Sequence, residues 1–262
     1  MTNYQIVFLD IDGTVLPPND IIEESTKRAV ASLHEQGIEV FLATGRPLHE
    51  IASIADELNI HSFIGYNGAY AVYNGKDLLN KPMDETIVKN FLTIAKENGH
   101  EIVLYTREKN LLSSLDDPTM KEFIEKFRLS KNALYTPDMS DDILGITLIK
   151  LKEKDVALYE TNQAVHLSQV NIEGFHHSYD VIQDTVNKGL AVKKILEQLG
   201  IPKESAIAFG DGMNDKEMLS YVGEGFAMEN GHPDLFSYAN RKTTSVTNSG
   251  IFNGLKTLGL VK

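Results

Sequence analysis

The sequence contains no cysteine in its 262 residues. Disulfide bonds, thiolate nucleophiles and cysteine-ligated zinc or iron–sulfur centres are therefore excluded. A reducing compartment agrees with this composition, although the composition alone does not prove it. The 8 histidines show no spacing typical of metal ligands, so we do not expect a histidine metal site either.

Basic residues are in the minority, and long apolar runs are missing. The chain has 25 lysines and arginines against 37 aspartates and glutamates, a formal net charge of −12. Because nonspecific contact with nucleic acid or an anionic membrane needs a basic surface, we expect neither partner. No segment approaches the roughly 20 apolar residues of a membrane span. The start MTNYQIVFLDIDG also lacks the features of a signal peptide, so we expect a soluble cytoplasmic protein.

Short apolar segments alternate with amphipathic ones in the first and last parts of the chain. The apolar, β-branched segments are predicted strands, which span residues 5–9, 38–43, 62–66, 206–210 and 225–228. The amphipathic segments are predicted helices, which span residues 21–37, 47–59, 188–200 and 215–222. Strands that alternate with helices predict an α/β fold, here a doubly wound, Rossmann-like parallel sheet.

The middle of the chain has a different pattern, with alternating strands between a few helices. The predicted helices span residues 84–99, 118–127 and 152–162, and the predicted strands span 100–107, 143–151, 165–172 and 178–184. This antiparallel α+β pattern predicts a second domain inserted into the first. We therefore expect a catalytic core at 1–82 and 184–262 and an inserted α+β domain at 83–183.

Two aspartates follow the first predicted strand in the stretch FLDIDG. Ligands of open parallel sheets bind beyond the carboxyl ends of the strands, and Asp10 and Asp12 lie there. Positions two apart on an extended backbone point to the same side, so both carboxyls can address one site. The alternative is an Asp-Gly turn with solvated acids.

Two further acids follow another apolar strand in FGDGMND, residues 209–215. With Asp211 and Asp215 added to the first pair, the carboxylates would raise one another's pKa values. A divalent cation removes this repulsion, and hard oxygen ligands select Mg²⁺. The alternative is a glycine-rich turn in which Asn214 or Asp215 caps a helix.

Three shorter motifs could bind an anion. In LATGRP, Thr44 and Gly45 stand before a helix and could form an anion site, or Thr44 could simply cap that helix. In TVNKGLAVKK, Lys188 opens a helix, where a cation is unfavourable unless an anion lies nearby; a surface lysine is the alternative. In YNGAY, Asn67 could reach a substrate, although a left-handed turn before Gly68 is the favoured interpretation.

Together these motifs resemble the haloacid dehalogenase (HAD) superfamily of phosphohydrolases. DIDGT, TGR, NKG and GDGMND occur in the order of that family, each at the expected strand end or helix start. The block between TGR and NKG is similar to the type-two cap of the Cof-type sugar-phosphatase branch. YNGAY and the tail SVTNSGIFNGL are also similar to that branch, so the likeness spans essentially the whole chain.

The resemblance implies a role for each acid. Asp10 would attack phosphorus and form an aspartyl-phosphate, and Asp12 would be the general acid and then the base. The carboxylates of Asp10 and Asp211, with the main-chain carbonyl of Asp12, would hold Mg²⁺, and Asp215 would complete or tune that site.

The resemblance also implies which groups would contact the phosphate, and of these Thr44 and Lys188 are predicted to be catalytic as well. The predicted contacts are Thr44, Lys188, Asn214, Asn67 and the amides of Ile11 and Gly45. Arg46 either touches substrate or pairs with an acid in the core. His176, His177 and Tyr179 lie near the end of the inserted domain, and structural roles are favoured for them.

The sequence therefore predicts a Mg²⁺-dependent phosphohydrolase for a small phosphorylated metabolite, such as a sugar phosphate. A phosphomutase on the same scaffold would need a strongly basic cap, and the acidic stretches SLDD and MSDD count against it. A non-catalytic binding protein would not need the Asp10/Asp12 pair. The cap carries no signature of one substrate, and no heptad repeat indicates an oligomer.

Overall fold

The computed structural model describes residues 3–139, 142–160, 164–170 and 172–262. The chain forms two units. The first comprises Met1–Arg46, Ala52–Asn80 and Asn187–Lys262, and the second comprises Pro47–Ile51 and Lys81–Val186. The end of the predicted helix 152–162 and position 171 of the predicted strand 165–172 lie outside the described residues.

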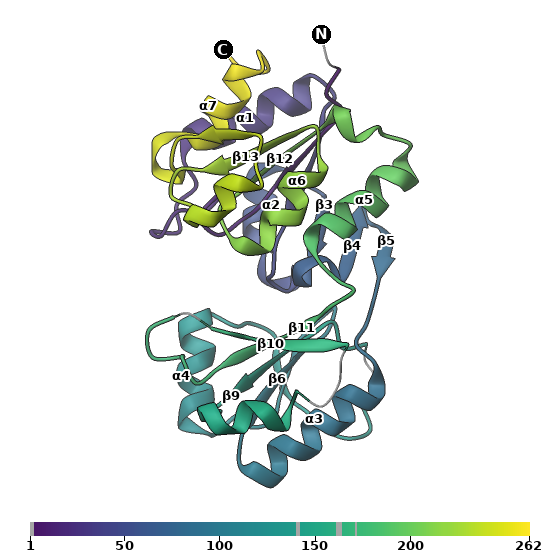
Figure 1. Cartoon of the computed structure of the whole chain (residues 1–262), viewed down its shortest axis with the longest axis vertical. Coiled ribbons are helices and arrows are strands. Elements are labelled where there is room, and N and C mark those ends of the chain that lie inside the picture. The colour runs from purple at the N-terminus through teal and green to yellow at the C-terminus, as the bar shows by residue number, and fades with distance from the viewer. Residues whose placement is uncertain (1–2, 140–141, 161–163, 171) are drawn as a thin grey trace. The chain divides into compact units, whose positions relative to one another are not determined.

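A mostly parallel sheet forms the centre of the first unit (Figure 1). Its strands run in the order β14-β13-β12-β1-β2-β3-β4-β5, parallel from β14 to β3 and antiparallel from β3 to β5. They are β1 (Ile6–Leu9), β2 (Glu39–Ala43), β3 (Ser62–Gly65), β4 (Tyr70–Tyr73), β5 (Lys76–Asn80), β12 (Ala206–Gly210), β13 (Glu224–Met228) and β14 (Arg241–Thr243). The predicted doubly wound parallel sheet is confirmed.

Helices cover both faces of this sheet (Figure 1), α1 and α7 on one and α5 and α6 on the other. The helices are α1 (Glu24–Glu35), α2 (Ala52–Leu58), α5 (Lys188–Leu199), α6 (Lys216–Tyr221) and α7 (Gly250–Thr257). The unit's short 3₁₀ turns are η2 (Tyr66–Gly68), η4 (Lys203–Ser205), η5 (Met213–Asp215), η6 (Pro233–Ser237) and η7 (Val246–Asn248). Within the described part of the chain, no helix has the length and apolarity that a membrane span requires.

The predicted helix at 47–59 is wrong in its first part. A 3₁₀ turn, η1 (Leu48–Glu50), precedes α2, and Ile51 separates the two. The carboxylate of Glu50 accepts hydrogen bonds from the backbone N–H and hydroxyl of Ser130 and from Asn110 Nδ2, all at 2.8 or 2.9 Å. These partners belong to the second unit, so tertiary contacts override the helical pattern.

The second unit has its own sheet, in the order β10-β11-β9-β6-β7-β8. Its elements are α3 (Glu85–Asn98), β6 (Glu101–Tyr105), β7 (Asn110–Leu112), α4 (Pro118–Phe127), β8 (Asn132–Leu134), β9 (Gly145–Ile149), η3 (Glu153–Leu158), β10 (Val165–Gln169) and β11 (Tyr179–Gln183). Its strands pair antiparallel except β7 with β8. α3 packs on one face and α4 on the other. The helix predicted at 152–162 is a 3₁₀ turn instead.

Candidate active site

The predicted motifs of the core gather at one edge of the first sheet. Asp10 follows β1, Thr44 follows β2, and Asp211 follows β12. These strands are parallel and adjacent, so their carboxyl ends meet at the same edge. The backbone N–H of Asp10 still pairs with the carbonyl of Phe209 at 3.0 Å, which keeps the loops after β1 and β12 together.

A buried lysine links two of the acids. Lys188 Nζ lies 2.5 Å from Oδ1 of Asp10 and 2.7 Å from Oδ1 of Asp215, and all three side chains are buried. Burial alone would lower the pKa of Lys188, but the two carboxylates outweigh it and the pKa rises. They are the anions that make a cation acceptable at the start of α5.

The loop after β12 is held by Asp215. Its Oδ2 accepts hydrogen bonds from the backbone N–H groups of Asp211 and Gly212, each at 3.0 Å. Both carboxylate oxygens of Asp215 are thus engaged, one by Lys188 and one by the loop. Asp211 is oriented by Thr14, whose Oγ1 donates to Asp211 Oδ1 at 3.0 Å. Thr14 stands in the DIDGT motif but is not among the residues predicted for the site.

Three carboxylates converge closely enough to share a cation. One oxygen from each of Asp10, Asp211 and Asp215 lies within 4.8 Å of the others. Burial, and then repulsion from Asp215, raise the pKa of Asp10 well above its ordinary value and the pKa of Asp211 to about 6. The positive charge of Lys188 lowers both pKa values but does not outweigh burial and the neighbouring carboxylates. An all-oxygen donor set of this kind fits Mg²⁺.

The carboxylate of Asp12 is not part of this cluster. Arg46 Nε donates to Asp12 Oδ2 at 2.9 Å, and Arg46 Nη2 donates to the other oxygen. The two-residue alternation of a strand does not continue, because β1 ends at Leu9 and the chain then turns. The carbonyl of Ile11 accepts the amides of three following residues in that turn.

The polar groups after β2, β3 and β12 also come together. Thr44 is buried, and its Oγ1 accepts the N–H of Arg46 at 3.0 Å, so its own proton is available to a ligand. Asn67 has the left-handed backbone expected for a turn, with φ 54°. Its Oδ1 accepts Asn214 Nδ2 at 3.0 Å. A Cβ on Gly45 would lie 3.0 Å from the same Asn67 oxygen, so these motifs are in close contact.

Comparison with known families identifies the chain. The sequence model of the haloacid dehalogenase-like hydrolase family matches residues 7–255. The protein belongs to this family. The resemblance carried by DIDGT, TGR, NKG and GDGMND is thereby confirmed, and the carboxylate cluster of this HAD-like hydrolase lies where those motifs meet.

Relatives of this HAD-like hydrolase cover nearly its full length. YkrA of Bacillus subtilis (strain 168), a candidate phosphatase, is 33% identical over 98% of this chain and 99% of its own. The 5-amino-6-(5-phospho-D-ribitylamino)uracil phosphatase YitU of the same strain is 27% identical over 97% of each chain. A crystal structure of a Geobacillus kaustophilus HTA426 protein matches with a TM-score of 0.92 and 32% identity, over 99% of this chain and 100% of that one.

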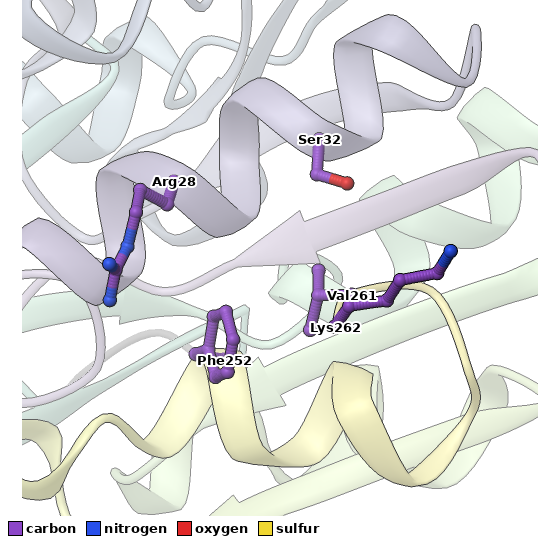
Figure 2. A pocket seen from close by; sticks show the side chains of 5 residues that line it. All are labelled: Arg28, Ser32, Phe252, Val261 and Lys262. Atoms are coloured by element: carbon purple, nitrogen blue, oxygen red, sulfur yellow. The ribbon is translucent and has the colours of Figure 1, made fainter.

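The HAD-like hydrolase also has a pocket that involves none of these residues. Figure 2 shows it, with a volume of about 230 Å³, lined by Arg28 and Ser32 of α1, Phe252 of α7, Val261 and Lys262. The guanidinium of Arg28 lies over the ring of Phe252, 5.8 Å from its centroid. None of the five lining side chains is a carboxylate.

Proposed function

We propose that this HAD-like hydrolase is a Mg²⁺-dependent phosphatase. Its substrate would be a small phosphorylated metabolite, such as a sugar phosphate, and the reaction would pass through an aspartyl-phosphate on Asp10. The observation that carries the proposal is the convergence of Asp10, Asp211 and Asp215 at one sheet edge, where buried Lys188 pairs with Asp10 and Asp215. The names of YkrA and YitU support phosphatase activity, and the named substrate of YitU is a small phosphorylated metabolite.

The nucleophile must be ionised although it is buried. Lys188 supports this state of Asp10 by donating to Oδ1, which leaves Oδ2 for attack on phosphorus. As the new O–P bond forms, the ester O–P bond breaks and its electron pair leaves with the substrate oxygen. Asp12 would supply the proton to that oxygen and later accept one from water, which releases phosphate and regenerates Asp10.

The donor set assigns different roles to the three clustered acids. Asp10 and Asp211, with the carbonyl of Asp12, would hold Mg²⁺, whereas both oxygens of Asp215 already accept hydrogen bonds. Asp215 would therefore position Lys188 and the loop that carries Asp211. When bound, Mg²⁺ would lower the repulsion between an anionic nucleophile and an anionic phosphate.

Hydrogen-bond donors from the neighbouring loops would bind the phosphate. We assign to it the hydroxyl of Thr44, the amides of Ile11 and Gly45, Asn214 Nδ2 and the ammonium of Lys188. Asn67 would orient Asn214 through their 3.0 Å hydrogen bond rather than act as a main contact. Removal of one such donor is expected to lower kcat by about 10²–10³.

Phosphate release from p-nitrophenyl phosphate with Mg²⁺ tests the proposal. Asp10→Asn should abolish release, and the matched control Asp56→Asn, an exposed aspartate on α2, should retain it. EDTA should stop the reaction and excess Mg²⁺ should restore it. Acid quenching during turnover, followed by mass spectrometry, should find a phosphoryl group on the peptide that contains Asp10.

The alternatives have different outcomes in the same assays. Undiminished release by Asp10→Asn, or none by the native protein, would contradict the phosphatase. Interconversion of sugar phosphate isomers without free phosphate would instead identify a phosphomutase. Tight binding of a phosphorylated metabolite that is never converted would identify a binding protein.

A further inference from the structure

A turn after β13 contacts both loops that carry the acids of the candidate site. The side-chain Nδ2 of Asn230 donates to the carbonyl of Gly13, in the loop after β1, at 2.8 Å. The backbone N–H of His232 donates to the carbonyl of Asp211, in the loop after β12, also at 2.8 Å. A Cβ on Gly231 would lie 2.9 Å from that same carbonyl oxygen. Three consecutive residues thus pack against both loops.

The tail of the first unit fixes which way the amide of Asn230 faces. The backbone N–H of Val246, in η7, donates to Asn230 Oδ1 at 2.8 Å. Because a backbone N–H can only donate and the carbonyl of Gly13 can only accept, each end of this amide has one possible assignment. Val246 belongs to the stretch SVTNSGIFNGL, residues 245–255. Asn230 therefore links this stretch to the DIDGT motif.

The bond to Gly13 affects the carbonyl of Asp12, which would be a Mg²⁺ ligand in the proposed function. The peptide between Asp12 and Gly13 is trans, and its N–H donates to the carbonyl of Leu16 at 2.9 Å. In a trans peptide the C=O and N–H groups point in opposite directions, so the Asp12 carbonyl points away from Leu16. Gly13 has no side chain to restrict its backbone. Its two hydrogen bonds, one on each side of its Cα, supply that restriction, and Asn230 makes one of them.

We infer that Asn230 is a positioning residue for the metal site, and that it fixes the direction of the Asp12 carbonyl through Gly13. The inference rests on the proposed Mg²⁺-dependent phosphatase and adds a residue to its metal site. Asn230 is exposed, and its two amide atoms are used by Gly13 and Val246. Loss of its side chain should therefore weaken Mg²⁺ binding, and should lower activity only as a consequence.

Binding of Mg²⁺ can be measured without turnover, from the rise in Tm that added MgCl₂ produces. We expect Asn230→Ala to raise the Kd for Mg²⁺ about 10–100-fold, as is typical when a group that orients a metal ligand is lost. With p-nitrophenyl phosphate, the same variant should need more MgCl₂ for half-maximal activity. Its kcat and KM at saturating Mg²⁺ should stay close to the native values, which separates metal positioning from a contact with the phosphate.

Asn240 offers a matched control at the opposite end of β13. Its Nδ2 donates to the carbonyl of Gly223 at 2.8 Å, and its Oδ1 accepts the backbone N–H of Gly225 at 2.6 Å. Like Asn230, it is exposed and joins two backbone groups. Asn240→Ala should therefore lower the Tm of the metal-free protein by a similar amount, but it should leave the Kd for Mg²⁺ unchanged.

Asn230→Asp separates the hydrogen bond from the effect of charge. The aspartate keeps an acceptor for Val246 but replaces the donor to Gly13 by an oxygen, and it adds a negative charge. If this side chain acted by direct attraction to the cation, the variant would bind Mg²⁺ more tightly. We expect it to bind Mg²⁺ more weakly than the native protein does.

Three results would overturn the inference while leaving the phosphatase intact. One is an equal Kd for Mg²⁺ in Asn230→Ala and the native protein. The second is an equal rise in that Kd in Asn230→Ala and Asn240→Ala, which would assign the effect to lost stability. The third is tighter Mg²⁺ binding by Asn230→Asp. If MgCl₂ changes neither the Tm nor the activity of the native protein, the proposed function itself fails and the inference falls with it, so the two failures are distinguishable.

Discussion

Lys188 donates a 2.5 Å hydrogen bond to Asp10, and both side chains are buried. The two residues are 178 positions apart in the chain. Their contact therefore joins the start of α5 to the end of β1, and Asp215 is joined to them by the same ammonium group. A single buried cation thus holds together the two loops that carry the acids.

Replacement of Lys188 by methionine should destabilise the protein as well as inactivate it. The change leaves Asp10 and Asp215 buried without a cation, and breaking a buried pair in this way costs about 3–5 kcal/mol. We expect a clear fall in the urea midpoint and no measurable phosphate release. Lys193→Met, at an exposed position of the same helix, is the control. Equal midpoints for the two variants would show that the ammonium of Lys188 is not structurally needed.

Arg46 should act through Asp12, because its guanidinium holds that carboxylate with two hydrogen bonds. If Asp12 protonates the leaving oxygen, Arg46→Ala should matter most for poor leaving groups. We expect a steeper dependence of log kcat on leaving-group pKa across aryl phosphates, with a loss of about 10²-fold for the most basic leaving group. Arg46→Lys keeps the charge but not the two-point geometry. Its dependence of log kcat on leaving-group pKa should therefore lie between those of the native protein and Arg46→Ala.

A matched arginine makes this test specific. Arg241 also binds a carboxylate, Glu224, through two nitrogens in the first unit. Arg241→Ala should leave the leaving-group dependence unchanged. If Arg46→Ala and the native protein have the same slope of log kcat against leaving-group pKa, Arg46 has no part in the proton transfer by Asp12.

Gly13 should be needed for the position of Asp211. Its φ is +83°, and a Cβ there would lie 2.2 Å from Asp211 Oδ2. Gly75 has a similar φ of +77° but nothing within 4 Å of such a Cβ. The positive φ should cost each of Gly13→Ala and Gly75→Ala about 1 kcal/mol of stability, and Gly13→Ala should lose more because its Cβ also displaces Asp211. Only Gly13→Ala should raise the Mg²⁺ concentration required for half-maximal activity. A normal Mg²⁺ response in Gly13→Ala would place the metal away from Asp211.

The parallel core could be predicted because its strands are short apolar runs with polar residues directly after them. The predicted strand 206–210 coincides with β12 (Ala206–Gly210). Strand order then brings the acids after β1 and β12 together, since both strands end at the same edge. The prediction missed β4 and β5, a hairpin whose turn residues Asn74 and Gly75 have positive φ values, although an Asn-Gly pair is itself a sequence signal for such a turn.

Details of the site depended on contacts that no local pattern contains. Strand alternation suggested that Asp10 and Asp12 face one site, but the turn at Ile11 directs the Asp12 carboxylate to Arg46. The roles of Thr14 and Glu50 depend on partners 197 and 80 residues away. Short-range periodicity describes which face is buried, whereas these side chains are placed by distant segments.

Asp180→Asn should stabilise the protein at neutral pH, because Asp180 is a half-buried carboxylate that forms no ion pair with a cation in the described part of the chain. Burial raises its folded-state pKa above the unfolded value, so the folded state takes up the proton first and the cost of the charge disappears on acidification. The gain in Tm should therefore be full at pH values above the raised folded-state pKa and vanish as the pH falls toward the unfolded pKa, about 4. Thermal unfolding across this range measures it, with Asp184→Asn as the control for net charge. A lower Tm for Asp180→Asn at neutral pH would mean that the carboxylate is retained for the fold.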